Sequence, residues 1–442
     1  MKLLVDGYAL GVQHGTGLTR YSIETVHTLK QLGHSVDLLL GAAATRANAK
    51  VLPSVVLQKL MADPPRSLFD TPVSELFEIA LAMVRHSLSP LGVAADSARP
   101  VAFDQAFISA DSVVDFDDFA AIYNSNEIYR AAFVSASVTG KNLVIKPPHG
   151  AESPDLFHCT SPLPVAMKAI PRVTTVHDLI PLTFPQATKI PLRRYHQIMR
   201  AAIADSAMLC CVSEHSANEL TKFFTVPESR IAVTYQSVDL TSYVELLTDS
   251  FVSTVLGEYG LEHGGYLLFN GAVEPKKNVD RLLDAYAQSA VTLPLVVLGP
   301  SGWMCEAVED RIQCAGKSGS QKVIRIGFLE RLSQLAIIKG AAALCFPSLA
   351  EGFGLPVLEA MSLGTPVITS DKPALKELVG DAALTVNPYS TASIAAAIRN
   401  VVNDNRASAE LSLQGIERSG RFSSEQYQLR LQAAYEAALG VA

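Results

Sequence analysis

Short apolar segments alternate with longer stretches of helix length along most of the chain. In the second half, the apolar segments hold five or six residues each: 266–270, 294–299, 323–327, 341–346, 366–370 and 383–387. Strands that alternate with helices along a chain form parallel sheets covered by helices on both faces. The second half therefore predicts one Rossmann-like α/β domain.

The first half begins with the same pattern. A strand at 2–6 is followed by a helix that carries Ile23, Val26 and Leu29 and stops at Gly33, and then by a strand at 35–40. Three further strands are expected at 171–178, 207–213 and 230–235. Six prolines between 53 and 100 interrupt the mostly helical pieces of the segment 42–150, which we interpret as an insertion.

A boundary between the two halves is expected within 243–265, where a helical segment gives way to a glycine-rich one. We therefore predict an N-terminal domain at 1–250 and a C-terminal domain at 251–422, each an α/β doubly wound fold. In such folds, ligands bind at the carboxyl ends of the strands. A binding site built from both halves follows as an expectation.

Composition limits the classes of partner. The chain has 442 residues, 49% of them hydrophobic and 18% charged, with a net charge of −7. This charge predicts no general attraction to nucleic acid. The six cysteines lack the spacing of a zinc site and predict reduced, mostly buried thiols. No apolar run suits a signal peptide or a membrane span, so we expect a cytoplasmic protein.

The most distinctive segment is 347-PSLAEGFGLPVLEAMSLGTPVI-368. A strand leads into the glycine loop 352–354, and Pro356 then stands in the first turn of a helix, where its missing N–H has no cost. A glycine loop at a helix N-terminus presents backbone N–H groups to a phosphate. Glu351 and Glu359 flank the loop, although each taken alone could be a solvated acid or a helix-dipole partner.

The string E-G-F-G-L-P-x-x-E resembles the E-x7-E signature of the retaining glycosyltransferases of family 4, which have the GT-B fold of two Rossmann-like domains. The resemblance implies that Glu359 hydrogen-bonds the ribose of a nucleotide. It assigns the sugar-diphosphate end to Glu351, Gly352, Phe353, Gly354 and Leu355.

A second segment, 270-NGAVEPKKN-278, resembles the family's G-x-x-E-P-R-K-N motif. Lys276 and Lys277 could be ordinary surface charge. The resemblance places them at the donor diphosphate, where cations offset developing negative charge. Lys276 replaces an arginine and so lacks its bidentate geometry. Many relatives also have arginine where this chain has Ala272, so Lys277 is the firmer assignment.

Two segments of the first domain resemble the same family. The string 177-HDLIPLTFP-185 implies that His177 orients the donor sugar, while Asp178 shapes the turn; a packed or surface histidine is the alternative. The loop 15-GTGLTRY-21 resembles the family's N-terminal glycine loop and assigns Gly15 and Gly17 to the donor, with Arg20 as an acceptor or phosphate contact. A simple tight turn is the alternative.

Two further segments suggest contacts. Phe328 and Leu329, in 325–335, match the position where the family holds the nucleotide base. Basic residues gather in 189-KIPLRRYHQIMR-200, namely Lys189, Arg193, Arg194, His196 and Arg200. They form either a solvated helix face or a peripheral contact with anionic lipid, which would suit a polyprenyl-diphosphate-linked acceptor.

Together these resemblances imply a retaining hexosyltransferase that acts on a carbohydrate or lipid-linked acceptor. The variants of the motifs look most like mannosyltransferases of bacterial polysaccharide assembly, so GDP-mannose is the favoured donor and UDP-sugars are the alternative. An epimerase or phosphorylase on the same fold and a non-catalytic scaffold stay open. No cofactor and no metal are expected. Residues 423–442 resemble the family's last helix, which packs back on the first domain.

Overall fold

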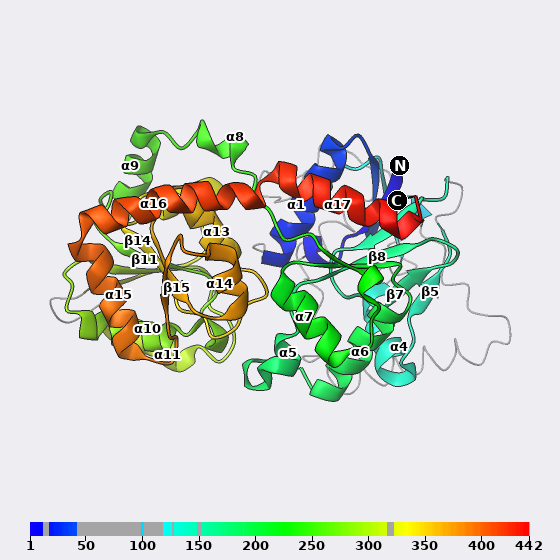
Figure 1. Ribbon diagram of the computed structural model, residues 1–442, viewed down its shortest axis with the longest axis horizontal. Helices are drawn as coiled ribbons and strands as arrows, with labels where there is room; N and C mark the ends of the chain where they lie inside the picture. The colour runs from blue at the N-terminus through cyan, green and yellow to red at the C-terminus, as the bar shows by residue number, and fades with distance from the viewer. Residues whose placement is uncertain are drawn as a thin grey trace, which may run out of the picture. The chain divides into compact units, whose positions relative to one another are not determined.

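A computed structural model describes residues 1–11, 17–41, 99–100, 118–125, 128–147, 152–188, 190–315 and 322–441. The chain forms two compact units (Figure 1). The first unit comprises residues 1–212, 216–234 and 427–442, and the second comprises 213–215 and 235–426.

The division between the units falls at 234/235, earlier than the expected 250/251. The reason is that α9 (Asp249–Glu258) belongs to the core of the second unit, where Val252, Val255 and Leu256 are buried. A short helix, α8 (Thr241–Val244), precedes it. Residues 423–442 were expected to pack back on the first domain, and residues 427–442 belong to the first unit.

The second unit is built on a six-stranded parallel sheet in the order β13-β12-β11-β14-β15-β16. All six predicted strands are present: β11 (Leu267–Asn270), β12 (Leu295–Leu298), β13 (Val323–Ile326), β14 (Ala343–Phe346), β15 (Val367–Ser370) and β16 (Leu384–Val386). Their residues are mostly buried, as expected of a sheet that is covered on both faces.

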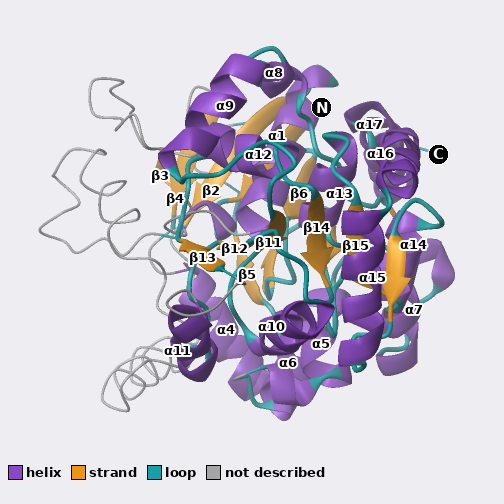
Figure 2. Ribbon diagram, turned by 90° about the vertical axis from the view of Figure 1, so that its left-hand side faces the viewer, coloured by secondary structure: helices purple, strands orange, loops and turns teal. Residues whose placement is uncertain are grey.

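Helices cover both faces of this sheet (Figure 2). One face carries α12 (Arg331–Lys339), α13 (Leu355–Ser362) and α16 (Asn405–Ser419), and the other carries α10 (Val279–Ser289), α11 (Glu306–Ala315) and α15 (Thr391–Asn403). A further helix, α14 (Pro373–Val379), packs on β15. The alternation of strand and helix predicted from sequence is thus confirmed for this unit.

The first unit has an eight-stranded sheet in the order β10-β9-β8-β6-β1-β2-β4-β3. Its strands are β1 (Lys2–Asp6), β2 (Ser35–Leu40), β3 (Arg99–Pro100), β4 (Ala121–Asn124), β6 (Leu156–Cys159), β8 (Arg172–Val176), β9 (Met208–Cys211) and β10 (Ile231–Val233). Only β3 runs antiparallel to its neighbour among these described strands. A separate parallel pair joins β5 (Leu143–Ile145) to β7 (Val165–Met167).

The interpretation of 42–150 as an insertion is wrong for its last third. Strand β4 pairs with β2 inside the sheet, and α4 (Ile128–Thr139) packs its Ile128 and Ala132 into the core below it. The six prolines between 53 and 100 interrupt the alternation of strand and helix on which the prediction depended, and this alternation resumes only at β4. Most of 42–117 lies outside the described residues.

Alternate residues of β1 face opposite layers of the first unit. Leu3 and Val5 pack with α1 (Gly17–Gln31) and α17 (Ser424–Leu439), whereas Leu4 packs with α4. Helices α5 (Ile180–Thr183), α6 (Leu192–Ala204) and α7 (Glu214–Phe223) follow β8 and β9. The C-terminal helix α17 is therefore part of the core of the first unit.

Polar groups fix α17 in place. The Tyr427 hydroxyl hydrogen-bonds to the hydroxyls of Thr25 at 2.9 Å and Tyr21 at 3.0 Å, and both partners lie on α1. The Tyr435 hydroxyl bonds Nδ1 of His158 at 2.6 Å. Because these groups are fully buried, each hydrogen bond compensates a polar atom that has lost its water.

Candidate functional site

The strand order of the second unit reverses between β11 and β14. Such a switch point leaves a crevice outside the carboxyl ends of the two strands, where ligands of open α/β sheets bind. The loop 271–278 follows β11, and the loop 347–354 follows β14. The two motif segments that sequence analysis singled out therefore emerge at one point of one sheet.

Backbone and side-chain bonds join the two loops. The amide N–H of Leu349 donates to the Lys276 carbonyl at 2.7 Å. Asn278, held in the left-handed region at φ 63°, donates its side-chain amide to the Pro347 carbonyl at 3.0 Å and the Pro388 carbonyl at 2.8 Å. These bonds fix the position of the lysines that precede Asn278.

Lys277 and Glu351 form the central ion pair of this site, with Nζ 2.7 Å from Oε1. Their side chains are only 13% and 9% exposed, so water screens the pair weakly. The Lys277 ammonium also lies 4.9 Å from the centre of the Phe346 ring. Two of the residues predicted for the donor diphosphate and sugar are thus in direct contact.

The charge state of Glu351 follows from its neighbours. Burial alone would raise the pKa of Glu351, but the charges of Lys277 and Lys276 outweigh it, so the pKa is lowered from its ordinary value. Lys276 itself lies 3.4 Å from Glu274. The site therefore holds an ionised glutamate between two lysines.

The glycine loop ends at the start of α13 in the predicted way. Gly354 stands before the helix at φ 122°, a conformation that favours glycine, and Pro356 lies in the first turn. No side chain caps this N-terminus. Phe353 was expected to contact the donor sugar and its diphosphate. Its side chain is buried against Tyr235 and Phe422, so its backbone is the part available to a ligand.

Glu359 lies one turn into α13 and is fully buried. Its Oε1 is 2.8 Å from Nη1 of Arg331, the first residue of α12. Sequence analysis missed Arg331, although one signal was present: a cation at the first residue of a helix opposes the helix dipole. Phe328 and Leu329 lie in the loop before α12, and the Phe328 side chain is 48% exposed.

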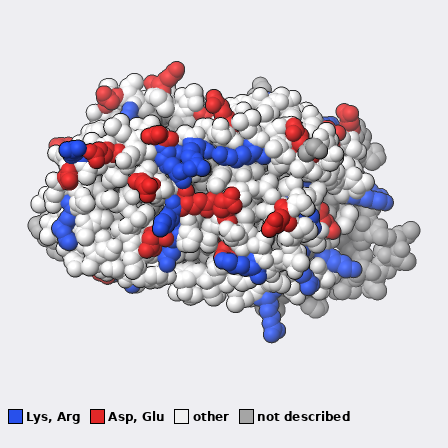
Figure 3. Space-filling model, viewed as in Figure 1, with Lys and Arg blue, Asp and Glu red and all other residues white. Residues whose placement is uncertain are grey.

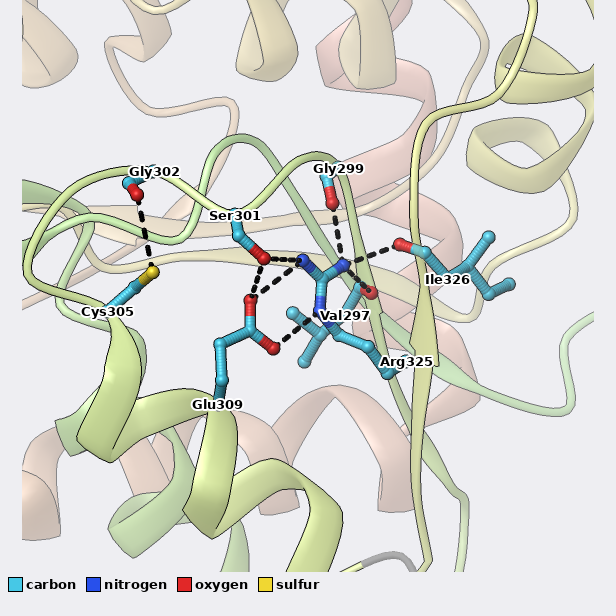
Figure 4. A network of polar contacts seen from close by, with 8 residues as sticks. All are labelled: Val297, Gly299, Ser301, Gly302, Cys305, Glu309, Arg325 and Ile326. Carbon is cyan, nitrogen blue, oxygen red and sulfur yellow. Dashed lines mark hydrogen bonds and ion pairs between the residues drawn. The ribbon is translucent and has the colours of Figure 1, made fainter.

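The loop after β12 borders the lysine loop. Arg325 on β13 pairs with Glu309 of α11 at 2.9 Å and donates to the Gly299 carbonyl at 2.6 Å (Figure 4). Ser301 donates to Glu309 at 2.7 Å, so the loop is fixed at its base. From that loop, the indole N–H of Trp303 donates to Glu274 at 3.1 Å. Trp303 thus helps to hold the carboxylate that contacts Lys276.

In the first unit, His177 directly follows β8 and is partly buried. Its Nε2–H donates to the Thr160 carbonyl at 2.8 Å, which fixes the proton on Nε2 because a carbonyl only accepts. The Tyr21 ring meets the imidazole edge-on at 4.8 Å. Burial lowers the pKa of His177 despite the Thr160 bond and the Asp178 charge. As predicted, Asp178 shapes the turn by accepting from the Ile180 N–H at 3.0 Å.

The strand order of the first unit reverses between β1 and β6, next to His177. Asp6 ends β1 and accepts hydrogen bonds from the backbone and the hydroxyl of Thr160. Burial raises the pKa of Asp6 to about 6, although the bonds from Thr160 oppose the rise. Gly17 and Arg20 lie in the first turn of α1, and Gly15 lies outside the described residues.

Some basic side chains of the segment 189–200 are exposed to solvent, and others pack against neighbouring residues. Arg193 and Arg200 on α6 are exposed, whereas Arg194 donates to Ser137 at 3.0 Å and His196 stacks on Phe224. Lys189 lies outside the described residues. On the face drawn in Figure 3, acidic and basic side chains are interspersed. The membrane contact stays a prediction.

Within the described ranges, no helix has the length and apolarity needed to cross a membrane. Among the same residues, no group of three or more His, Cys, Asp or Glu side chains could hold a metal ion. All six cysteines are free, and only Cys314 is exposed.

Two family models match the chain. Residues 259–418 match "Glycosyl transferases group 1", and residues 149–242 match "Glycosyltransferase Family 4". The chain is 30% identical over 258 residues to O-antigen chain mannosyltransferase B of Escherichia coli. The aligned region covers 57% of this chain and 67% of that protein. The chain is 27% identical over 231 residues to O-antigen chain mannosyltransferase RfbU of Salmonella typhimurium, covering 51% of this chain and only 60% of that relative.

Solved structures share the fold over nearly the whole chain. Anabaena Alr3699/HepE in complex with UDP and glucose matches with a TM-score of 0.60 at 15% identity, covering 99% of this chain and 100% of that one. Sucrose-phosphate synthase from Thermosynechococcus elongatus matches with a TM-score of 0.65 at 15% identity, covering 100% of both chains.

Two Rossmann-like units give the chain the GT-B fold, and the two family models identify it as a glycosyltransferase. The Escherichia coli mannosyltransferase, which is 30% identical to this chain over two thirds of its own length, indicates the family of glycosyltransferases. The chain belongs to glycosyltransferase family 4.

Proposed function

We propose that this protein is a retaining mannosyltransferase that moves mannose from GDP-mannose to a carbohydrate acceptor in polysaccharide assembly. The observation that carries the proposal is the joint position of Lys277, Glu351 and Glu359 at the switch point of the second sheet. A lysine and an uncapped helix N-terminus suit a diphosphate, and carboxylates suit the hydroxyl groups of a sugar and a ribose.

The choice of mannose is supported by the relatives of Escherichia coli and Salmonella typhimurium, which are both named as mannosyltransferases. A UDP-sugar is the alternative donor, favoured by the UDP and glucose bound in the HepE structure. The acceptor is a carbohydrate or a polyprenyl-diphosphate-linked oligosaccharide. An amphipathic contact of α6 with anionic lipid at the inner face of the cytoplasmic membrane would bring the enzyme to such an acceptor.

The reaction that suits these groups is a displacement on one face of the sugar. The bond from the anomeric carbon to the diphosphate oxygen breaks, the acceptor hydroxyl attacks from the same side, and the departing phosphate takes its proton. Lys277 and the α13 N-terminus stabilise the leaving diphosphate. His177, held neutral by burial and fixed through Nε2, orients the sugar by a hydrogen bond.

A thermal-shift panel tests the donor assignment. We expect GDP and GDP-mannose to raise the melting temperature, because a ligand that binds the folded state stabilises it by mass action. The shifts should shrink in Glu359→Ala and Lys277→Ala. They should persist in Glu410→Ala, a control that removes an exposed glutamate paired with Arg406.

The panel separates the alternatives. A response to UDP alone would replace the GDP-mannose assignment by a UDP-sugar, and no response to any nucleotide would remove the proposed function. Retention is tested separately by the anomeric configuration of the product that forms with mannose-terminated oligosaccharides.

A further inference from the structure

Arg331 occupies a place that helix electrostatics disfavours. It is the first residue of α12 and directly follows the N-cap residue Glu330, whose carboxylate accepts a hydrogen bond from Ser333 at 3.2 Å. The helix dipole disfavours a cation at this end by about 0.3 to 1 kcal/mol. The contacts of the guanidinium therefore determine where the Arg331 side chain lies.

Three contacts hold the Arg331 side chain. Its Nη1 lies 2.8 Å from Oε1 of Glu359 and 3.5 Å from Oε1 of Gln334. Its guanidinium carbon lies 5.9 Å from the centre of the Tyr243 ring. Gln334 in turn donates to the Asn270 side chain at 3.0 Å, and Asn270 is the last residue of β11. The contacts tie Arg331 to the switch-point strand.

The charge balance makes Arg331 the cation for Glu359. Glu359 is fully buried, and Arg331 is 23% exposed. A buried carboxylate is costly unless a cation or several donors compensate it. Lys277, by contrast, pairs with Glu351. The two glutamates of the motif thus have separate cationic partners from separate loops.

We propose that Arg331 is a positioning residue that fixes the Glu359 carboxylate in the orientation that accepts hydrogen bonds from the ribose hydroxyls of the donor. This inference rests on the proposed function, in which Glu359 binds the ribose. A carboxylate has about four lone-pair sites, so one carboxylate can accept hydrogen bonds from an arginine and from a ribose diol at the same time. Arg331 acts on the nucleotide only through Glu359.

The test measures discrimination between ribose and deoxyribose. Dissociation constants are determined by calorimetry for GDP or UDP, whichever binds the wild type, and for its 2′-deoxy and 3′-deoxy forms. Because hydrogen bonds to a charged group are strong, we expect at least one deoxy form to bind the wild type roughly tenfold or more weakly. In Arg331→Ala and Glu359→Ala the ratio should fall to within about threefold.

Two more variants isolate the mechanism. Arg331→Lys keeps the charge without the planar fork and should restore part of the discrimination. Adding Glu359→Ala to Arg331→Ala should cause no further loss, since both remove one interaction.

Arg325→Ala is the matched control, because Arg325 is also a partly buried arginine with a glutamate partner, Glu309 (Figure 4). It should lower the melting temperature and leave the discrimination ratio unchanged.

The outcomes are distinct. If Glu359→Ala lowers the ratio and both Arg331 variants keep that of the wild type, the inference is overturned while the proposed function stands. If the wild type and Glu359→Ala bind all three nucleotides alike, the ribose assignment of Glu359 fails and the inference fails with it. A fall in the ratio for Arg325→Ala equal to that for Arg331→Ala would reduce Arg331 to general structural support and overturn the inference.

Discussion

The buried His158 should make the stability of the first unit depend on pH. Its ring bonds Tyr435 through Nδ1 at 2.6 Å and Thr175 through Nε2 at 2.9 Å. Burial, together with the nearby His177, lowers the pKa of His158 from 6.5 to about 3. In the window between these values the unfolded chain binds a proton that the folded chain does not. Stability is therefore full above pH 6.5 and falls as the pH drops below it.

The size of the effect follows from the same pKa values. At pH 5, about 1.5 pH units below the unfolded pKa, the loss is about 2 kcal/mol, since each unit corresponds to about 1.4 kcal/mol. Asp6 opposes it. Its pKa is raised to about 6, so its contribution is present at low pH and is lost as the pH rises through 6. The wild type alone would thus show a smaller net change than His158 causes.

A comparison of the wild type with His158→Asn measures how much His158 contributes to the pH dependence of stability. We expect the wild type to lose about 2 kcal/mol more than His158→Asn between pH 8 and pH 5. Hydrogen exchange of the α17 and β6 amides measures this in the first unit. The single tryptophan, Trp303, lies in the second unit, so the urea transition of its fluorescence should respond equally in both proteins. Equal pH dependence of α17 exchange in the two proteins would show that His158 is not held neutral by burial.

Three other changes should have measurable effects. Lys277→Ala leaves the Glu351 carboxylate without its nearest cation, so kcat/KM for the donor should fall at least tenfold, and unchanged kinetics would refute the role of the pair. Gly299→Ala should destabilise the second unit by on the order of 3 kcal/mol in urea titrations, because φ is +128° and a Cβ would lie 2.4 Å from a backbone oxygen. Gly327→Ala, with nothing within 4 Å, should be nearly neutral, and equal effects would contradict this account. Tyr427→Phe removes two buried hydrogen bonds and should lower the free energy of local unfolding of α17 by roughly 1 to 3 kcal/mol. Amide exchange in α17 should therefore become faster, and an unchanged exchange rate would contradict this prediction.

Local pattern was enough to predict the second unit. Its strands are runs of buried apolar residues between helices, and the loops after β11 and β14 carry their motifs in contiguous sequence. The loops that carry Lys277 and Glu351 were expected at the carboxyl ends of the strands, and the structure has them at one sheet edge. The first unit was predicted less well, because β5, β6, β7 and β8 follow one another without a helix between them and so interrupt the alternation of strand and helix.

The side-chain partners could not be predicted from sequence. Arg331 and Glu359 are joined by the packing of two helices, and Tyr435 meets His158 across 277 residues of chain. Such contacts depend on the order of strands in a sheet, which pattern alone does not determine. Only the unfavourable position of Arg331 in its helix was a local sign, since residues that break a local rule often serve a site.

The return of α17 has a consequence for synthesis on the ribosome. The first unit holds residues 1–212 and 216–234, but its core is closed by Tyr427, Leu431 and Tyr435. About 190 residues separate the two parts, and at about 5 to 20 residues per second they take roughly 10 to 40 s to be made. Throughout that time the apolar surface of α1 and β1 lacks its cover. The first unit can therefore close its core only after all of residues 235–426 have been synthesised.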